Sequence, residues 1–472
     1  MNKNKSAIRN PQSEIAVIGS GFLGLTLALR YAEQGARVTV YESAPEIGGL
    51  ASAWHLNEAI VWDRHYHVTL LSDSFTRKIV EEIGLADEFE WVETKTGFYT
   101  DGKLVSMSNT LEFLRFPPLG LVSKFRLGGT IFYAARVNDW KSLEKISVED
   151  WLTRLSGRKT FDKMWRPLLM AKLGEAYRET SAAFIWATIQ RMYAARKSGL
   201  KKEMFGYVRG GYARVLERFA AHLKEKGVRF RLHSRVERIE QENGKIYVST
   251  AQNAAHYHAE VKSEAETEFH EVDVRPVGVE SYRDEFDTAI LTCPSNVAAH
   301  LCPQLTAAEK RRLEDIRYQG IVCASVLMKK SLSEFYVTNI TDETPFTGII
   351  EMSALVDKRE FGGRALVYLP KYVAPDDELF DRTDEEIEEL FLTGLEKMYP
   401  HFRRADVEAF KISRVHRVFP LPVLNYSEKV PKVETSIDGV YILNSAQITN
   451  GTLNVNETIQ LAEKFFEREF RK

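Results

Sequence analysis

Three glycines near the start of the chain, Gly19, Gly21 and Gly24, have the G-x-G-x-x-G spacing of a dinucleotide-binding turn. Gly19 allows a tight turn after a strand, Gly21 lets the backbone approach a pyrophosphate, and Gly24 lets the next helix pack close to the strand. The pyrophosphate would bind at the N-terminus of that helix, where free N–H groups and the helix dipole favour anions. Phe22 and Leu23, between the glycines, belong to the same predicted site.

Glu42 ends a strand-like run at residues 37–42. A carboxylate at this position can accept hydrogen bonds from both ribose hydroxyls, and it would repel a 2′-phosphate, so the site disfavours NADP. Gly48-Gly49 follows, and a glycine pair close behind the ribose-binding acid resembles the extended FAD-binding pattern of flavin oxidoreductases. The spacing therefore favours FAD, bound also by Ser43 and Leu50. No second G-x-G-x-x-G lies between a strand and a helix, so one dinucleotide is expected.

The elements that must position these residues follow from the patterns around them. Residues 15–18 have the apolar character of a buried strand. The helix after the turn has Leu23, Leu27 and Tyr31 on one face and ends at Gly35, a residue type favoured just past a helix. Strand, glycine turn, helix and strand together predict a βαβ unit that binds a nucleotide.

Later segments change between helical and strand patterns. Residues from 73 to about 200 have mainly helical patterns rich in Trp, Phe, Leu and Arg, whereas 317–411 contain strands and an acidic helix. Glu242-Asn243-Gly244, between two alternating runs, predicts a hairpin. The polar residues 252–285 predict an exposed loop or an extended hairpin. A strand at 439–443, a polar loop and an amphipathic helix close the chain.

The composition is that of a soluble globular protein, since 44% of the 472 residues are hydrophobic and 28% are charged. The formal net charge of −2 gives no bulk preference for nucleic acid. Cys293, Cys302 and Cys323 lack disulfide or metal-binding spacing, so we expect no metal and a cytoplasmic location. The polar N-terminus has no apolar signal core, and no apolar run approaches the roughly 18 residues of a membrane span.

These features together resemble the flavin-dependent amine oxidase superfamily, in its protoporphyrinogen-oxidase-like branch. That superfamily also contains phytoene-type desaturases and, more distantly, UDP-galactopyranose mutases. The resemblance rests on the N-terminal glycine motif and on matches spread over most of the chain. They are the Gly206-Tyr-x-x-Gly210-Gly211 turn, the strand at 287–294, and the final strand, loop and helix with Asn456-Glu457-Thr458.

The resemblance implies an α/β fold, more closely an α+β two-domain flavoprotein. A Rossmann-type FAD-binding domain would be assembled from residues 13–72, 204–294 and 412–472. A substrate-binding domain of helices plus a mixed β-sheet would be inserted as residues 73–203 and 295–411.

The resemblance also implies further cofactor-binding residues. Val236 would offer backbone contacts near the adenine. The terminal loop and helix, with Asn444, Ser445, Asn454 and Val455, would lie along the pyrophosphate and the flavin ring. The helix N-terminus would point at the flavin C2 oxygen, where it would stabilise negative charge. Asn444-Ser445 replaces the Gly-Asp that is usual in the family.

The segment His65-Tyr66-His67 follows the glycine pair and is the candidate wall facing the flavin. The alternative is that these side chains are core groups linking the two domains. Arg64 could face a carboxylate or phosphate of the substrate, or could pair with Asp63. The chain has no G-x-S-x-G or H-E-x-x-H motif, so the flavin itself would carry the redox step.

Other residues could line the substrate pocket, although packing or turn roles are favoured for them. They are Tyr207, Arg209 and Tyr212 beside the Gly210-Gly211 pair, and Trp165, Arg166, Trp186 and Tyr193 in the helical segment. A third group, His256, His258 and His270, has ligand types suited to zinc, but its polar, acidic surroundings favour a solvated loop.

Residues 114–136 mix basic and large apolar side chains. This run could contact a membrane surface peripherally, as in relatives with lipophilic substrates, although helices packed on the sheet are favoured. The expected partner is a small organic substrate, and the sequence does not determine the oligomeric state.

The favoured activity is FAD-dependent oxidation, with hydride transfer from an amine, a porphyrinogen-like ring or an isoprenoid to flavin N5. Oxygen or a quinone would then reoxidise the flavin. One alternative is a phytoene- or squalene-type desaturase, and another is a flavin-binding protein without catalysis. A non-redox enzyme resembling UDP-galactopyranose mutase is also open. A mutase needs arginines around a diphosphate, and the candidates are Arg178, Arg191, Arg196 and Arg209.

Overall fold

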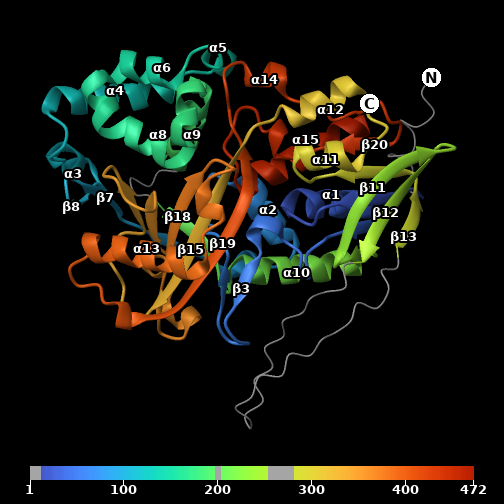
Figure 1. The fold of residues 1–472 in the computed structure, drawn as a ribbon, viewed down its shortest axis with the longest axis horizontal. Helices are drawn as coiled ribbons and strands as arrows, with labels where there is room; N and C mark the ends of the chain where they lie inside the picture. Colours follow the sequence, from blue (N-terminus) through green and yellow to red (C-terminus); the bar gives the residue numbers. More distant parts are fainter. Residues whose placement is uncertain (1–11, 197–203, 253–280, 472) are drawn as a thin grey trace, which may run out of the picture.

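The computed structural model describes residues 12–196, 204–252 and 281–471 (Figure 1). A parallel five-stranded sheet carries the glycine turn, in the order β10-β2-β1-β14-β20. These strands come from distant parts of the chain: β1 (Glu14–Ile18), β2 (Arg37–Tyr41), β10 (Arg229–Arg231), β14 (Thr288–Leu291) and β20 (Val440–Ile442). The strand order reverses between β1 and β14, and a crevice for a ligand is expected at the carboxyl ends of strands on either side of such a point.

Alternate residues of β1 face different layers, because side chains alternate across a strand. Ile15 and Val17 pack under four helices, and Ala16 and Ile18 pack on the opposite face. The four helices are α1 (Phe22–Glu33), α2 (Ser74–Glu82), α10 (Gly211–Glu225) and α15 (Val455–Arg471). The opposite face is covered by β11 (Ser234–Glu242), β12 (Lys245–Gln252), β13 (Ser281–Phe286), α11 (Ser295–Leu301) and α12 (Ala307–Glu314).

Two predicted turns are confirmed in this half of the molecule. Gly35 follows α1 with φ of +89°, as a residue just past a helix often does. Asn243 and Gly244 have φ of +51° and +82° and join β11 to β12 in a two-residue hairpin. β12 and β13 pair antiparallel on either side of residues 253–280, which lie outside the described part of the chain.

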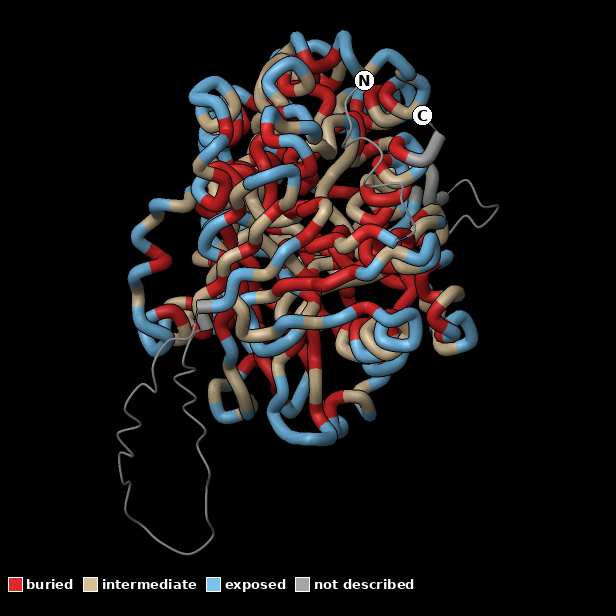
Figure 2. The backbone as a smooth tube through the Cα atoms, turned by 90° about the vertical axis from the view of Figure 1, so that its right-hand side faces the viewer, coloured by how far each residue is buried: buried red, intermediate tan, exposed pale blue. Residues whose placement is uncertain are grey.

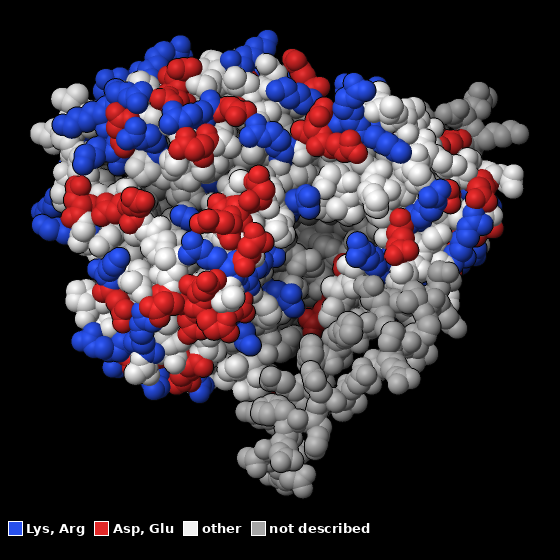
Figure 3. Space-filling view, in the orientation of Figure 1, with Lys and Arg blue, Asp and Glu red and all other residues white. Residues whose placement is uncertain are grey.

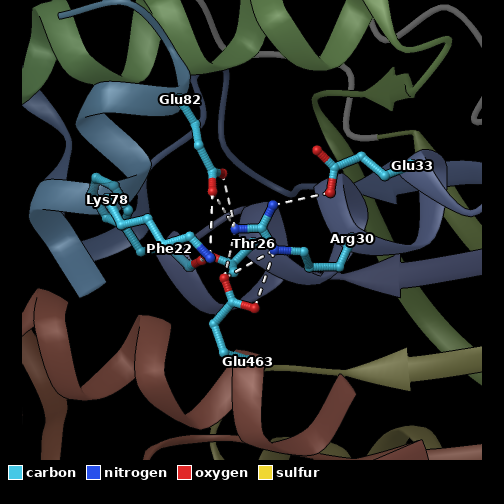
Figure 4. Close-up of polar contacts among 7 residues, drawn as sticks. All are labelled: Phe22, Thr26, Arg30, Glu33, Lys78, Glu82 and Glu463. Carbon is cyan, nitrogen blue, oxygen red and sulfur yellow. Dashed lines mark hydrogen bonds and ion pairs between the residues drawn. The ribbon is translucent and has the colours of Figure 1, made fainter. Parts of the chain in front are cut away.

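Arg30 connects three of the helices that cover the sheet. Its Nη2 lies 2.6 Å from Glu463 Oε1 of α15 and 2.8 Å from Glu82 Oε2 of α2, and its Nη1 lies 2.9 Å from Glu33 (Figure 4). Arg30 and Glu463 are buried. A buried cation surrounded by carboxylates holds α1, α2 and α15 in one arrangement.

A mixed seven-stranded sheet forms the second half of the molecule, in the order β19-β15-β18-β17-β16-β7-β8. Helix α13 (Asp384–Met398) packs on one face of this sheet. The strands are β7 (Thr96–Thr100), β8 (Lys103–Ser106), β15 (Tyr318–Met328), β16 (Val337–Ile340), β17 (Gly348–Glu351), β18 (Ala365–Val373) and β19 (Val407–Pro420). Two small sheets pack nearby: β3 (Ala53–His55) with β4 (Val61–Asp63), and β5 (Thr69–Leu70) and β6 (Phe89–Glu93) with β9 (Met204–Val208).

A group of helices lies beyond one end of this sheet (Figure 1). It packs around a core that includes Trp151, Phe161 and Tyr177. The helices are α3 (Thr110–Arg115), α4 (Leu121–Ala134), α5 (Trp140–Leu143), α6 (Val148–Ser156), α7 (Arg158–Thr160), α8 (Arg166–Leu173) and α9 (Ala182–Arg196), and a short α14 (Tyr426–Lys429) lies separately. Buried stretches run through the centre of the molecule, and exposed ones lie on its periphery (Figure 2).

Two features of the structure do not follow the predicted division into domains. β19 runs without interruption across the predicted boundary between residues 411 and 412. Helices α11 and α12 belong to the predicted substrate segment, yet they pack against the five-stranded sheet. The domain boundaries therefore stay a prediction. Among the helices in the described residues, none combines the length and the apolar character that crossing a membrane requires.

Candidate cofactor groove and active site

The glycine turn connects the end of β1 to the N-terminus of α1. Gly19 has φ of +108°, and a Cβ there would lie 2.6 Å from Thr292 Oγ1. A Cβ on Gly24 would lie 2.1 Å from the Gly19 carbonyl oxygen, so close helix packing requires glycine. A Cβ on Gly21 would meet no atom within 4 Å. Gly21 caps α1 without a side-chain hydrogen bond, so the helix N-terminus borders open space.

Glu42 extends from the end of β2 toward this turn. Its Oε2 accepts hydrogen bonds from the Ser20 backbone N–H at 3.1 Å and the Ser20 hydroxyl at 2.7 Å. The Gly48 N–H donates to the Ser20 carbonyl at 3.0 Å, which brings the glycine pair against the turn. Sequence reasoning missed Ser20, although its position between Gly19 and Gly21 was a signal. The carboxylate and both glycine motifs thus meet at one end of a groove.

One cavity of about 2030 Å³ contains this groove. It is larger than the roughly 300–1,000 Å³ typical of small-molecule sites, so it has room for a dinucleotide and a substrate together. Gly24 lies beneath the turn, and every other predicted cofactor residue lines this cavity. They are Gly19, Gly21, Phe22, Leu23, Glu42, Ser43, Gly48, Gly49, Leu50, Val236, Asn444, Ser445, Asn454 and Val455. The cradle fits FAD, because open space lies over Gly21 while the Glu42 carboxylate lines the same end of the groove.

The last strand and helix complete the groove. Asn444 Oδ1 accepts from the Ala446 N–H at 2.9 Å, and its Nδ2 donates to the Cys293 carbonyl at 2.9 Å. This side chain therefore ties the end of β20 to the end of β14. Asn454 Oδ1 accepts from the Glu457 N–H at 3.0 Å and begins α15 at the cavity wall.

The segment His65-Tyr66-His67 lines the same cavity. His65 Nε2 lies 3.2 Å from Ser413 Oγ, and the Tyr66 hydroxyl lies 3.1 Å from the Tyr372 hydroxyl. Burial, with smaller effects of His67 and Arg64, lowers the pKa of His65 to about 3. Burial raises the pKa of Tyr66 to about 12. His65 and Tyr66 are therefore uncharged at neutral pH, and they both line the cavity and link the two halves of the molecule.

Asp63 and Arg64 contact other groups rather than each other. Asp63 Oδ1 accepts from the Tyr212 N–H at 3.0 Å. The Arg64 guanidinium lies 4.5 Å from the Trp54 ring centroid, and its Nε donates to the Ala53 carbonyl at 3.0 Å. Among the described residues Arg64 forms no ion pair with Asp63, because Trp54 and the Ala53 carbonyl hold its guanidinium. Arg64 is not among the residues lining the cavity, and its contact with a substrate stays a prediction.

Lys172 is a cavity residue that sequence reasoning missed. It lies in the last turn of α8, and its Nζ is 3.7 Å from the Tyr372 ring centroid and 5.0 Å from the Phe419 ring centroid. Burial lowers its pKa to about 7. The signal was its seven-residue spacing from Trp165, which places both side chains on one helix face.

The other candidates divide between cavity and packing roles. Trp165 and Tyr212 line the cavity. Arg209 pairs with Glu90, and Arg166 with Asp162, at partly exposed positions. The Trp186 indole N–H donates to the Val137 carbonyl. Tyr207, Arg209, Arg166, Trp186 and Tyr193 are not among the residues lining the cavity.

The arginines proposed for a diphosphate site are not brought together among the described residues. Arg178 pairs with Glu175 and Arg209 with Glu90, both with exposed side chains. Arg191 lines the cavity, but its Nη2 lies 2.8 Å from Asp73 Oδ2. The Arg196 side chain, and His256, His258 and His270, lie outside the described part. Within that part, no group of His, Cys, Asp and Glu could hold a metal ion.

The glycine turn lies at the switch point of a parallel sheet, where dinucleotides bind in folds of this kind. One cavity joins this turn to the mixed sheet and the helical group. Together these features are typical of a dinucleotide-binding enzyme fold. Residues 24–441 match the model of the flavin containing amine oxidoreductase family, and the chain belongs to this family. The resemblance, the fold class and FAD as the cofactor are thereby confirmed.

Solved structures show the same fold at low identity. A protein of Exiguobacterium sp. 255-15, provisionally named a protoporphyrinogen oxidase, has a TM-score of 0.71 and 17% identity over 98% of this chain and 99% of that chain. Reduced UDP-galactopyranose mutase has a TM-score of 0.71 and 14% identity over 98% and 94%.

Among curated proteins, a Synechococcus elongatus protein provisionally named zeta-carotene desaturase is 23% identical over 270 residues, 51% of this chain and 54% of that protein. The chain matches between 37% and 54% of the length of the first curated relatives.

Proposed function

We propose that the protein is an FAD-dependent oxidoreductase that removes hydride from a carbon of an apolar organic substrate. The observation that carries this proposal is the single cavity, which joins the dinucleotide groove to a chamber between the seven-stranded sheet and the helices. A flavin at the end of the groove would reach a substrate in the chamber without leaving the protein. When bound, FAD supplies the two-electron acceptor at N5.

The chain's own residues would bind and orient the two molecules. The α1 N-terminus, with Gly21 and Phe22, would hold the pyrophosphate, and Glu42 the ribose. The N-terminus of α15, at Val455, would stabilise negative charge on the flavin ring. Tyr66 and neutral His65 would form the substrate wall and exclude water.

The lining of the chamber favours a substrate without an amine group over an amine. Lys172 lies over the Tyr372 ring in its aromatic wall, and a protonated amine placed beside the charged form of Lys172 would be repelled. Apolar side chains of Leu168, Leu169 and Phe184 form part of the lining. The similarity to a protein named as a carotene desaturase supports the same choice.

The test is anaerobic titration of the purified flavoprotein. Bleaching of bound FAD by zeta-carotene or protoporphyrinogen IX would support carbon oxidation, and bleaching by putrescine would favour amine oxidation. Conversion of UDP-galactopyranose only after reduction by dithionite, with no net electron transfer, would refute the proposal in favour of a mutase. A protein that binds no FAD would refute it outright.

We further propose a peripheral membrane contact through one face of α4. Its buried side packs on α6 and α9, whereas large apolar side chains on the other side are exposed, with Phe125 and Val122 each 74% accessible. The others are Leu121, Phe132 and Tyr133. Exposed Arg115, Arg126 and Arg136 lie on or near this helix, and Lys and Arg gather over the helical group (Figure 3). An apolar face with basic neighbours fits an anionic lipid surface.

A further inference from the structure

Lys172 stands in the part of the cavity where α8 meets the seven-stranded sheet. Its Nζ lies over the Tyr372 ring of β18 and near the Phe419 ring of β19, 3.7 and 5.0 Å from their centroids. The nearby wall from the helical group is mainly apolar, although Thr188 and Arg191 of α9 also line the cavity. Its apolar side chains include Trp165, Leu168, Leu169, Phe184 and Ile185. The ammonium group therefore lies against a mainly aromatic and aliphatic part of the cavity wall.

The ammonium group has no counter-ion among the described residues. Within the described part of the chain, no carboxylate lies within ion-pair distance and no acceptor lies within hydrogen-bond distance of its Nζ, and burial alone lowers its pKa. Three other cations with little or intermediate exposure have oxygen partners. Lys124 Nζ donates to the Leu114 carbonyl at 2.8 Å, Arg191 contacts Asp73, and Arg30 contacts three carboxylates. Lys172 thus lacks the kind of oxygen partner that each of these three side chains has.

Packing on aromatic rings does not satisfy this group. The faces of Tyr372 and Phe419 attract the charge, but they accept none of the three N–H bonds in the way an oxygen does. Lys172 is half-buried, and a cation with reduced access to water and no protein acceptor is unfavourable. An anionic group entering the chamber would supply both the acceptor and the opposite charge.

A second donor stands beside Lys172. The hydroxyls of Tyr66 and Tyr372 are 3.1 Å apart, and one hydrogen bond between them uses one of their two protons. The other proton remains available to an acceptor. Lys172 and this tyrosine pair together form a donor set without a matching acceptor in the described protein.

We propose that Lys172 and the Tyr66–Tyr372 pair bind a carboxylate of the substrate, so that the substrate is an apolar molecule bearing a carboxylate. This inference rests on the proposed function, because it names the substrate class of the same cavity. It makes Lys172 a specificity-determining residue: a neutral hydrocarbon of equal size would lack the group that fills the donor set.

Calorimetric titration of the FAD-containing protein with decanoate and with 1-decanol tests the inference. These probes share an apolar body and differ in charge. K172M removes the charge and keeps most of the stem, K172R keeps the charge, and K159M removes an exposed lysine outside the cavity. The flavin content of every variant is measured on the same samples, so that a folding defect is visible.

We expect K172M to weaken decanoate binding about tenfold to a hundredfold, the range for a lost hydrogen bond to a charged group. K172R and K159M should bind decanoate as the wild type does, and 1-decanol should not distinguish the variants. Equal decanoate affinity in K172M and wild type, or no decanoate binding by the wild type, would overturn the inference. A wild-type protein that binds no FAD would instead refute the proposed function, and the same titration of the FAD-free protein would still decide the role of Lys172.

Discussion

Replacing Gly21 or Gly24 by alanine should have different effects on the stability of the apoprotein, although the two positions are only three residues apart. Gly21 has φ of −68°, which alanine adopts readily, and its Cβ would meet no protein atom within 4 Å. G21A should therefore leave the apoprotein as stable as the wild type, or about 0.4–1 kcal/mol more stable. A Cβ on Gly24 would lie 2.1 Å from a backbone oxygen. G24A should destabilise the apoprotein by about 1–3 kcal/mol through overpacking.

The methyl group of G21A would occupy the space proposed for the pyrophosphate. Loss of one hydrogen bond between the α1 N-terminus and a charged phosphate should weaken FAD binding about tenfold to a hundredfold. In urea unfolding, FAD at 100 times the wild-type Kd should stabilise the wild type by about 2.7 kcal/mol. A hundredfold weaker G21A would gain only about 0.4 kcal/mol. Equal FAD stabilisation of G21A and wild type would refute the assignment of the groove.

Three further predictions concern other parts of the molecule. Replacing Arg30 by Met should lower the free energy of unfolding by about 3–5 kcal/mol, because buried Glu463 loses its partner. Urea denaturation measures this free energy, and a decrease of less than about 1 kcal/mol would contradict the prediction. Because burial lowers the pKa of Lys172 to about 7, its charged form is present below pH 7 and disappears above it. Decanoate affinity should therefore fall by up to about tenfold per pH unit above 7. Tyr66 and Tyr372 stay protonated in this range, so they would not cause the decrease. A decanoate affinity that does not change with pH in calorimetry would contradict this role of Lys172. F125S should reduce co-sedimentation of the protein with phosphatidylglycerol vesicles. L56S, which replaces an exposed leucine in another region, should not reduce it. An equal loss of co-sedimentation in both variants would argue against membrane contact through α4.

Local sequence signals predicted the nucleotide unit well. The strand at 15–18, the helix from Phe22 and the hairpin at Asn243-Gly244 depend on residues close in sequence, so periodicity and turn chemistry define them. The cofactor groove was predictable for a related reason, because Gly19, Gly21 and Glu42 lie within one βαβ unit.

The chamber could not be predicted in the same way. The contact between His65 and Ser413, and that between Tyr66 and Tyr372, join residues about 300 positions apart. The environment of Lys172 depends on two strands that follow it by some 200 residues. Burial and missing counter-ions are properties of the assembled fold, and the helical pattern around Lys172 indicates only that it lies on a helix.

The order of the central sheet has a consequence for how the protein matures in the cell. β20 is an edge strand of this sheet, and α15 lines one end of the cavity, yet both follow the other strands of the sheet in the chain. Until they are synthesised, Arg30 lacks its Glu463 partner and the dinucleotide crevice is open on one side. We therefore expect stable cofactor binding to require the chain as far as α15, because a chain that stops before residue 440 would have a glycine turn but no closed compartment to retain the flavin.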